Sequence, residues 1–320
     1  MPMRLVCATH GHCFDGLASA VVFTRLAKAL NPKLEFEYHG CGYGIGQKRP
    51  GAAMLNGDEN AILDYRFDTA SSLTWFFDHH RTTFLDDEHR RVFEERKGGA
   101  RYFFDPEYSS CTKLIADVAR TEFSQSFDDL EELVHWADVI DSARFESAAQ
   151  AANREHPVLK MASVVEHFGD DKLLRRLIQQ LLTKPLSEVA SGRALQERYT
   201  PLGERHERFV ERVRSRSVKR GRVILCDLTD AVVDVIGKFS TYALYPESEY
   251  SVVIGLLSNG IKISVGFNPW AGAERNVDIS AICARWGGGG HPFVGGISFQ
   301  KSDLEKARQV ASQIADELAG

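Results

Sequence analysis

The chain has 320 residues, of which 43% are hydrophobic and 26% are charged, a balance typical of globular proteins. This composition excludes a wholly disordered chain, a collagen and a coiled-coil rod. The formal net charge of −5 excludes a global basic field that would draw the whole protein onto nucleic acid. At roughly 100–200 residues per domain, the length predicts two domains.

The first half of the chain alternates short apolar runs with helical patterns. Strands are expected at 4–8, 34–38, 60–63 and 73–77, and helices at 16–30, 110–119, 130–140 and 171–182. Ser109 or Ser110 is placed to cap the helix 110–119. Such alternation predicts an α/β domain whose parallel sheet carries helices on both faces.

After residue 184 the alternation of strands and helices gives way to a long, highly charged helical pattern. The segment 184–222 is helical in pattern and rich in basic side chains, which form either a solvated face or a track for a nucleic-acid strand. Beyond it, strands are expected at 222–228, 250–257, 261–267 and 296–299, and helices at 279–285 and 304–318. We therefore predict three parts, namely a first domain over 1–185, a linker helix over 186–220 and a smaller mixed-sheet α/β domain over 221–320.

Neither a membrane segment nor a cysteine framework is expected. No apolar run approaches the ~20 residues of a membrane-spanning helix, and the N-terminal segment turns polar too soon for a secretory leader. The six cysteines lack the paired spacing of a zinc knuckle or a disulfide scaffold. We expect a cytoplasmic protein with reduced thiols and no membrane partner.

Chemically active side chains follow three of the expected strands. The first apolar run leads into His10, Asp64 follows the strand 60–63, and Asp78-His79-His80 follows the strand 73–77. Ligands of open parallel sheets bind outside the carboxyl ends of the strands, so we expect these groups to converge. Carboxylates combined with imidazoles suit Mn²⁺, Mg²⁺ or Fe²⁺. One such residue alone is usually a turn or surface residue, but three coinciding strand ends predict a metal site.

Two motifs in this order resemble those of the DHH phosphoesterase superfamily. The first is Asp78-His79-His80 after a hydrophobic strand, with His10-Gly-His-Cys-Phe-Asp15-Gly upstream of it. The second is the glycine-rich stretch 287–296, GGGGHPFVGG, which resembles the GGGH motif of the DHHA1 domain. The resemblance spans nearly the whole chain. It implies a DHH domain followed by a DHHA1 domain, as in oligoribonucleases (nanoRNases) with pAp phosphatase activity.

The resemblance also implies a set of metal ligands for one or two Mn²⁺ ions, with Mg²⁺ or another divalent ion as alternatives. The matching residues are His10, Asp15, Asp64, His79 and Asp138. Asp141 stays open as a ligand in place of Asp138. Many members have an aspartate where this chain has Cys13, so Cys13 or its neighbour His12 stays open as a further ligand.

Catalytic and substrate-binding roles follow from the same resemblance. It implies that Asp78 and His80 are catalytic, with His80 near the substrate phosphate or the leaving group. Glycines let backbone N–H groups approach an anion because no Cβ stands in the way. The expected substrate-binding residues are Gly288, Gly289, Gly290, His291, Arg81 and Asn268.

Together these implications predict a phosphoesterase in which a metal-activated water hydrolyses phosphate esters of short oligonucleotides, dinucleotides or nucleoside bisphosphates. The expected partner is a small nucleotide or a short single-stranded oligonucleotide, and a homodimer stays open. Two alternatives also stay open. One is a nucleotide-binding protein with a degenerate metal site, and the other is a pyrophosphatase-like hydrolase of phosphoanhydrides.

Overall fold

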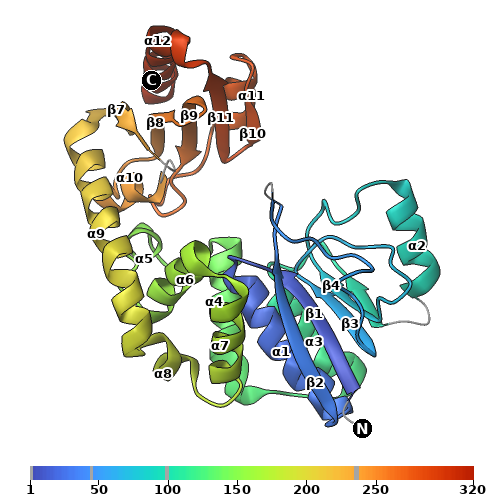
Figure 1. Ribbon diagram of the computed structural model, residues 1–320. Coiled ribbons are helices and arrows are strands. Elements are labelled where there is room, and N and C mark those ends of the chain that lie inside the picture. Colours follow the sequence, from blue (N-terminus) through green and yellow to red (C-terminus); the bar gives the residue numbers. More distant parts are fainter. Residues whose placement is uncertain (1–2, 44–45, 98–100, 234–237) are drawn as a thin grey trace. The chain divides into compact units, whose positions relative to one another are not determined.

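The computed structural model describes residues 3–43, 46–97, 101–233 and 238–320. The chain divides into two compact units. The first comprises residues 1–144 and 156–200, and the second comprises residues 145–155 and 201–320. Each unit has its own sheet, and the predicted two-domain α/β fold is confirmed (Figure 1). The limit at residue 200 lies within helix α9 (Arg193–Arg216), inside the segment 186–220. The exact domain limits stay a prediction.

The first unit contains a five-stranded parallel sheet in the order β2-β1-β3-β4-β5. Its strands are β1 (Met3–His10), β2 (Leu34–Cys41), β3 (Glu59–Leu63), β4 (Trp75–Asp78) and β5 (Arg101–Phe104). Its helices are α1 (Phe14–Leu30), α2 (Asp87–Lys97), α3 (Cys111–Phe123), α4 (Glu131–Ser142), α6 (Pro157–Phe168), α7 (Asp171–Leu181), α8 (Leu186–Ala190) and the 3₁₀ helix η1 (Asp128–Leu130).

Both faces of this sheet are buried. Trp75 and Phe77 point to one face, where the ring of Phe23 in α1 lies 5.3 and 6.0 Å from theirs between centroids. Phe76 points to the other face, where Phe93 of α2 packs on it. Helices therefore cover both faces, as predicted, and the central strands β1, β3 and β4 are nearly continuous buried runs because neither of their faces meets water.

The topology of the sheet brings the active side chains together. β1 has β2 on one side and β3 on the other, so the chain changes direction across the sheet between β1 and β3. Ligands bind at such a switch point, outside the carboxyl ends of the strands. His10 ends β1, Asp64 follows β3 and Asp78 ends β4, so all three lie at this edge.

The second unit contains a six-stranded mixed sheet in the order β10-β11-β9-β8-β7-β6. Its strands are β6 (Ser217–Arg220), β7 (Val223–Val232), β8 (Tyr250–Leu257), β9 (Gly260–Phe267), β10 (Gly289–His291) and β11 (Val294–Phe299). Its helices are α5 (Ala148–Asn153), α10 (Lys238–Leu244), α11 (Ile279–Ala284), α12 (Leu304–Ala319) and the 3₁₀ helix η2 (Lys301–Asp303).

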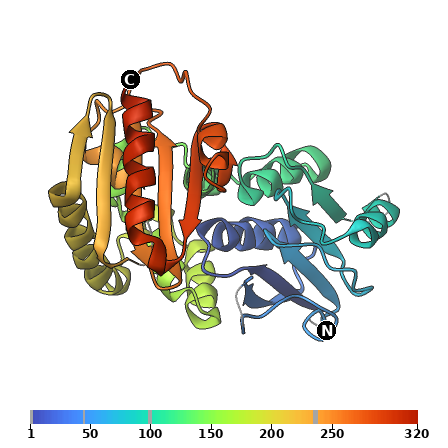
Figure 2. The ribbon, with the colours of Figure 1, turned by 90° about the horizontal axis from the view of Figure 1, so that it is seen from above.

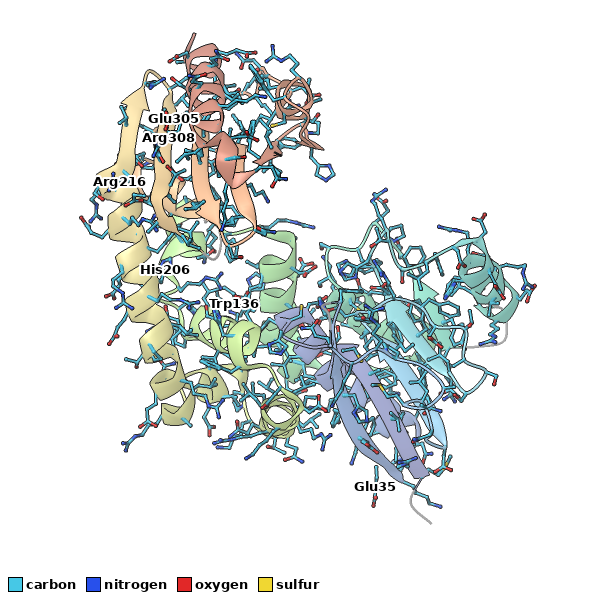
Figure 3. The ribbon with its side chains drawn as sticks, turned by 45° about the horizontal axis from the view of Figure 1, so that its top comes forward. Glu35, Trp136, His206, Arg216, Glu305 and Arg308 are labelled. Carbon is cyan, nitrogen blue, oxygen red and sulfur yellow. The ribbon has the colours of Figure 1, made fainter. Side chains whose placement is uncertain are left out.

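Helix α12 covers one face of the second sheet, as Figure 2 shows. Ile314 and Leu318 of this helix belong to the same buried cluster as Val252 of β8. Arg308 fastens the helix to β7, because its guanidinium donates to Asp227 Oδ2 at 3.0 Å. Figure 3 shows Arg308 beside Glu305 on the same helix, and these two side chains form an ion pair. The apolar face of α12 thus completes the core of this unit.

Several elements differ from the sequence-based expectation. The glycine-rich stretch 287–296, for which no strand is predicted before residue 296, contains the three-residue strand β10, which pairs with β11 at the edge of the sheet. Helix α6 is not predicted at all.

All six cysteines are free thiols. Within the described residues, no helix combines the length and hydropathy needed to cross a membrane.

Gly16 marks a close approach of α1 to β1. A Cβ at this position would collide with the carbonyl oxygen of His10, and the Gly16 carbonyl accepts a hydrogen bond from Thr9 Oγ1 at 2.6 Å. An alanine usually stabilises a helix relative to glycine by ~0.5–1 kcal/mol. Here we expect Gly16→Ala to lower the free energy of unfolding by ~1–3 kcal/mol in urea denaturation. The added Cβ would force the backbone of α1 and the backbone at His10 apart.

Gly51→Ala is the matched control, since a Cβ there would meet nothing within 4 Å. We expect it to change the free energy of unfolding by less than ~0.5 kcal/mol. Equal losses in the two variants would show that the contact with His10 has no effect.

Candidate metal centre

Three groups of potential metal ligands overlap at the carboxyl edge of the first sheet. In each group, one donor atom per residue lies within 4.8 Å of the others. The groups are Asp64-Asp78-His79-His80, His10-Cys13-Asp64 and Asp15-His79-Asp141. Asp64 and His79 each belong to two groups, so the three groups form one continuous cluster.

Asp64 lies at the middle of the cluster. Its Oδ2 is 3.5 Å from His10 Nδ1, and its Oδ1 is 3.5 Å from His79 Nε2. The residue is buried and has a φ of 54°, in the left-handed region that few residues other than glycine adopt. Its N–H donates to the Phe77 carbonyl at 2.9 Å. The backbone thus turns sharply after β3 and directs the carboxylate into the cluster.

The ring of His79 is oriented by the backbone. Its Nδ1 lies 3.1 Å from the carbonyl oxygen of Tyr108, to which it donates. Its Nε2 then faces the carboxylates, 3.4 Å from Asp141 Oδ2 and 3.8 Å from Asp15 Oδ2. A histidine whose other nitrogen donates to a carbonyl in this way is prepared to bind a metal through Nε2.

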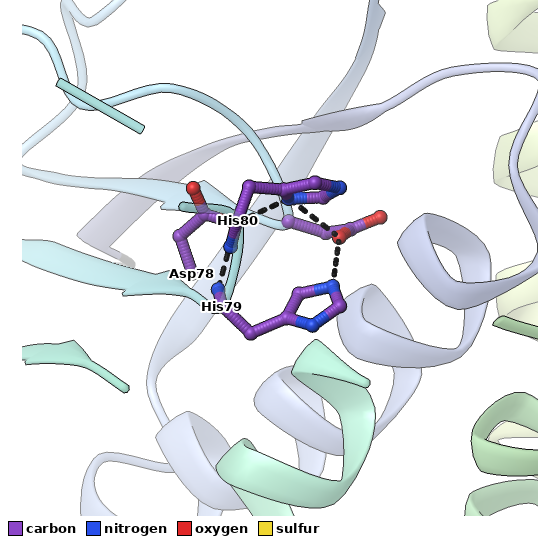
Figure 4. Close-up of side chains that lie close together, drawn as sticks. Asp78, His79 and His80 are labelled. Carbon is purple, nitrogen blue, oxygen red and sulfur yellow. Dashed lines mark hydrogen bonds and ion pairs between the residues drawn. The ribbon is translucent and has the colours of Figure 1, made fainter. Parts of the chain in front are cut away.

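Asp78 orients the second histidine of the motif. Its Oδ1 accepts hydrogen bonds from the N–H of His79 at 2.9 Å and from Nδ1 of His80 at 2.7 Å (Figure 4). Asp78 is fully buried, whereas about a third of the His80 side chain, 34%, is exposed. His80 is therefore the member of the motif that a ligand in solution can reach.

Asp15 contacts both the N-terminus of α3 and the ligand cluster. Its two carboxylate oxygens accept the N–H groups of Cys111 at 2.7 Å and Thr112 at 3.0 Å, at the start of α3. Ser110 caps the same helix, as predicted, by accepting the N–H of Lys113. Negative charge at a helix N-terminus is favourable, which holds Asp15 in place beside His79.

The pKa values of these groups reflect burial and crowding. Burial, with the nearby Asp64 carboxylate, raises the pKa of Asp15 well above its usual range and that of Asp141 to about 6. Burial would also raise the pKa of Asp64, but the adjacent His10 and His79 imidazoles, each 3.5 Å away, lower it to about 2. For His79, burial is outweighed by Asp64 and Asp15, which raise its pKa to about 10. In the absence of a metal, a proton on His79 therefore offsets part of the carboxylate charge.

The cluster contains buried polar atoms that are left unpaired by the described part of the chain. Within that part, His10 Nδ1, both carboxylate oxygens of Asp64, Asp78 Oδ2 and His79 Nε2 are buried and have no hydrogen-bond partner. Leaving such atoms unpaired costs ~1–3 kcal/mol each. All of them carry lone pairs that a cation can share, and the mixture of carboxylates and imidazoles suits Mn²⁺, Mg²⁺ or Fe²⁺. The residues therefore fit a divalent metal ion.

Of the two aspartates on α4, the structure brings Asp141 into the cluster. Asp138 instead contacts the hydroxyl of Ser109 and lies 3.7 Å from Lys113 Nζ. Cys13 is the N-cap of α1 and falls within the ligand group of His10 and Asp64. His12 points elsewhere, since its Nδ1 lies 3.1 Å from the Glu166 carbonyl.

The expected substrate-binding residues are more dispersed. Arg81 is 75% exposed and pairs with Glu107 at 2.8 Å. Asn268 is fully buried, and its amide donates to the carbonyls of Pro246 and Ser248, which leaves no donor for a ligand. Gly288, Gly289, Gly290 and His291 lie at or next to the exposed strand β10 of the second unit.

Two tyrosines beside the cluster were not singled out from the sequence. The rings of Tyr43 and Tyr65 lie 5.5 and 6.1 Å from the ring of His10 between centroids. Tyr65 directly follows Asp64, but no spacing rule connects it to Tyr43 in a preceding loop. Only the folded chain brings the three rings together.

Comparisons with known proteins agree on the fold. No protein-family model matches the sequence, and no curated protein matches it. Among solved structures, a pGpG-specific phosphodiesterase from Vibrio cholerae is similar at a TM-score of 0.69 and 19% identity, with 99% of this chain and 100% of that chain covered. The DHH domain of a protein described as a member of a family of ribosomal proteins is similar at a TM-score of 0.57 and 14% identity. That match covers 98% of this chain and 87% of the other.

RecJ from Thermus thermophilus, in complex with Mn²⁺, is similar at a TM-score of 0.53 and 12% identity. The match covers 99% of this chain and 52% of RecJ, so this chain spans about half of that exonuclease. These neighbours are DHH-domain proteins, which confirms the resemblance at the level of the fold.

Removing the central carboxylate is expected to remove metal binding. We expect Asp64→Asn to lower the affinity for Mn²⁺ by at least ~100-fold in isothermal titration calorimetry. The change removes the negative charge of the carboxylate whose two oxygens lie between His10 and His79. Asp86→Asn is the control, since Asp86 pairs with His89 at the surface. Equal affinities of the wild type and Asp64→Asn would contradict a metal site at this cluster.

Asp141 should destabilise the metal-free protein. Its pKa is raised to about 6, against ~3.9 in an unfolded chain, so its ionisation opposes folding increasingly from pH 4 to pH 6 and fully above that range. We expect Asp141→Asn to raise the free energy of unfolding by ~1–2 kcal/mol at pH 8 in EDTA. The gain should vanish near pH 4. A gain that is independent of pH would exclude this explanation.

Proposed function

We propose that this protein is a metal-dependent phosphoesterase that acts on short nucleotide substrates. The observation that supports it most directly is the overlapping ligand set at the switch point of the sheet, with its buried unpaired donor atoms. Its ligands would be His10, Asp15, Asp64, His79 and Asp141, with Cys13 beside them. A divalent ion such as Mn²⁺, once bound, supplies an activated water near neutral pH and neutralises charge on phosphoryl oxygens.

His80 is the group that meets the phosphate in this proposal. The hydrogen bond from His80 Nδ1 to Asp78, outweighing partial burial, raises the pKa of the imidazole. A protonated His80 presents Nε2–H to the negative charge that develops on a phosphoryl or leaving oxygen. Asp78 keeps the ring in that orientation and prevents it from turning toward Asp64, whose Oδ1 is 3.7 Å away.

The glycine-rich segment of the second unit is the proposed substrate-binding segment of that unit. β10 forms one edge of its sheet, so one side of this strand has no neighbouring strand. Gly290 has a φ of 150°, and Gly289 has open space where a Cβ would be, which lets an anion approach the backbone. His291 is exposed next to these glycines and can donate to a phosphate oxygen.

The choice of a short nucleotide rests on the comparisons. The pGpG-specific phosphodiesterase is matched over its full length, whereas RecJ is matched over half. A linear dinucleotide or a nucleoside bisphosphate is therefore the proposed substrate class.

Hydrolysis of a small panel in Mn²⁺ tests this proposal. The panel contains pAp, pGpG, a five-nucleotide RNA, a cyclic dinucleotide and inorganic pyrophosphate, each with an EDTA control. We expect turnover of pAp or pGpG that EDTA abolishes. Turnover of pyrophosphate alone would instead favour a phosphoanhydride hydrolase, and binding of nucleotides with no turnover would favour a degenerate site.

The two histidine positions should give different kinetic defects. We expect His79→Ala to lower kcat by more than ~100-fold, because Nε2 is lost from two ligand groups. We expect His291→Ala mainly to raise KM, by ~10-fold, because it removes a contact remote from the chemistry. His89→Ala is the control, since His89 pairs with Asp86 outside the cluster. Normal kcat in His79→Ala would overturn the site assignment.

A further inference from the structure

A stack of three side chains stands next to the metal centre. The rings of Tyr43 and Tyr65 are parallel to within 7° and 4.4 Å apart between centroids. The guanidinium carbon of Arg66 lies 4.7 Å from the centre of the Tyr43 ring. The Tyr65 hydroxyl donates to the Gly42 carbonyl at 2.7 Å, which fixes the loop that carries Tyr43. The guanidinium thus lies over a ring whose position is fixed by its neighbours.

This stack adjoins the cluster directly. Tyr65 and Arg66 follow Asp64 in the chain, and the Tyr43 ring meets the His10 ring edge-on at 5.5 Å. Burial, followed by the Asp78 carboxylate, raises the pKa of the Tyr43 hydroxyl, so the hydroxyl stays neutral beside the carboxylates. Arg66 therefore stands at the edge of the site where a phosphate would meet the metal ligands.

Arg66 lacks the ion-pair partner that several other arginines over aromatic rings have. Arg25, Arg101 and Arg222 each form an ion pair with a carboxylate. Arg275, over Phe293, shares the buried Nε without a partner, but its Nη1 donates to the Val277 carbonyl at 2.6 Å, and Arg90, over Phe84, is exposed to solvent. Among the described residues, the Arg66 side chain forms no ion pair and donates no hydrogen bond, and its Nε is buried without a partner. A buried, unpaired guanidinium donor is costly unless a ligand supplies the acceptor.

We propose that Arg66 binds a phosphoryl group of the substrate at the edge of the metal centre, and that Tyr43 is a positioning residue that fixes the plane of its guanidinium. The inference rests on the proposed phosphoesterase function and adds a substrate contact to it. A planar guanidinium binds two phosphoryl oxygens at once, which a lysine ammonium cannot do. Arg66 replaces Arg81 in this role, because Arg81 already pairs with Glu107.

Binding of 5′-AMP to the Mn²⁺-loaded protein tests the role of Arg66. We expect Arg66→Gln to weaken AMP binding by ~10–100-fold, and Arg66→Lys to restore only part of it. Neither change should alter the affinity for Mn²⁺. Adenosine, which has no phosphate, should bind equally to the wild type and to both variants. Unchanged AMP affinity in Arg66→Gln, with Mn²⁺ bound, would overturn the proposal.

Arg101→Gln is the matched control. Arg101 also lies over an aromatic ring, Trp75 at 4.3 Å, and it begins β5, so it belongs to the opposite end of the parallel strands. We expect this variant to bind AMP as the wild type does. An equal loss of affinity in Arg101→Gln and Arg66→Gln would mean that a general loss of stability, and not a phosphate contact, causes the defect.

The role of Tyr43 is tested by a pair of substitutions. Tyr43→Phe keeps the stacked ring and should keep the AMP affinity and KM of the wild type. Tyr43→Leu removes the ring and should raise KM several-fold, with a smaller change in kcat, because the guanidinium loses its orientation. Equal KM values in Tyr43→Leu and Tyr43→Phe would contradict a positioning role.

Failure of this inference can be told apart from failure of the proposed function. If the wild type hydrolyses pAp or pGpG and Arg66→Gln has the same KM, the function stands and the role of Arg66 is wrong. If the wild type hydrolyses no phosphoester, the same variants are compared for binding of inorganic phosphate. Loss of phosphate binding in Arg66→Gln alone would then support the contact while the phosphoesterase proposal fails.

Discussion

The structure of the first unit depends on keeping several carboxylates buried at one point. Asp15, Asp64 and Asp78 are each exposed by 1% or less, and Asp141 reaches the same cluster from α4. Like charges this close repel one another strongly, and burial makes their ionisation more costly still. The cluster persists because the N-terminus of α3 and the protonated His79 and His80 supply the opposite charge, and in our proposal a divalent ion takes the place of the proton on His79.

The fold and the chemistry therefore share residues. Asp15 caps α3 and faces His79, so the helix and the cluster use one carboxylate. Asp78 ends β4 and also orients His80. The left-handed backbone at Asp64 is a further cost, of ~1–3 kcal/mol, that the neighbouring hydrogen bonds of β4 offset. The stability of this edge is thus limited by the arrangement that would bind the metal.

Sequence patterns predicted most of the site because strand ends are local features. His10, Asp64 and Asp78 each follow an apolar run, and a parallel sheet brings such ends together without further information. The choice between Asp138 and Asp141 depends on which face of α4 points toward the cluster. Residue spacing alone does not give that orientation. The stack of Tyr43 on Tyr65 and Arg66 joins residues from separate loops, and no periodic pattern marks such a contact.

The brevity of β10 has a consequence for self-association. An edge strand exposes unpaired backbone groups, and another copy of the chain can add to it as a further strand. Proteins commonly protect such edges with lysines or prolines, but an edge that admits an anion, as we propose for β10, cannot be covered in this way. Here the strand has only three residues, Gly289–His291, followed by a turn that contains Pro292. Its short length leaves too few hydrogen bonds for a stable intermolecular ladder, so the backbone can remain open to a ligand without becoming a site of aggregation.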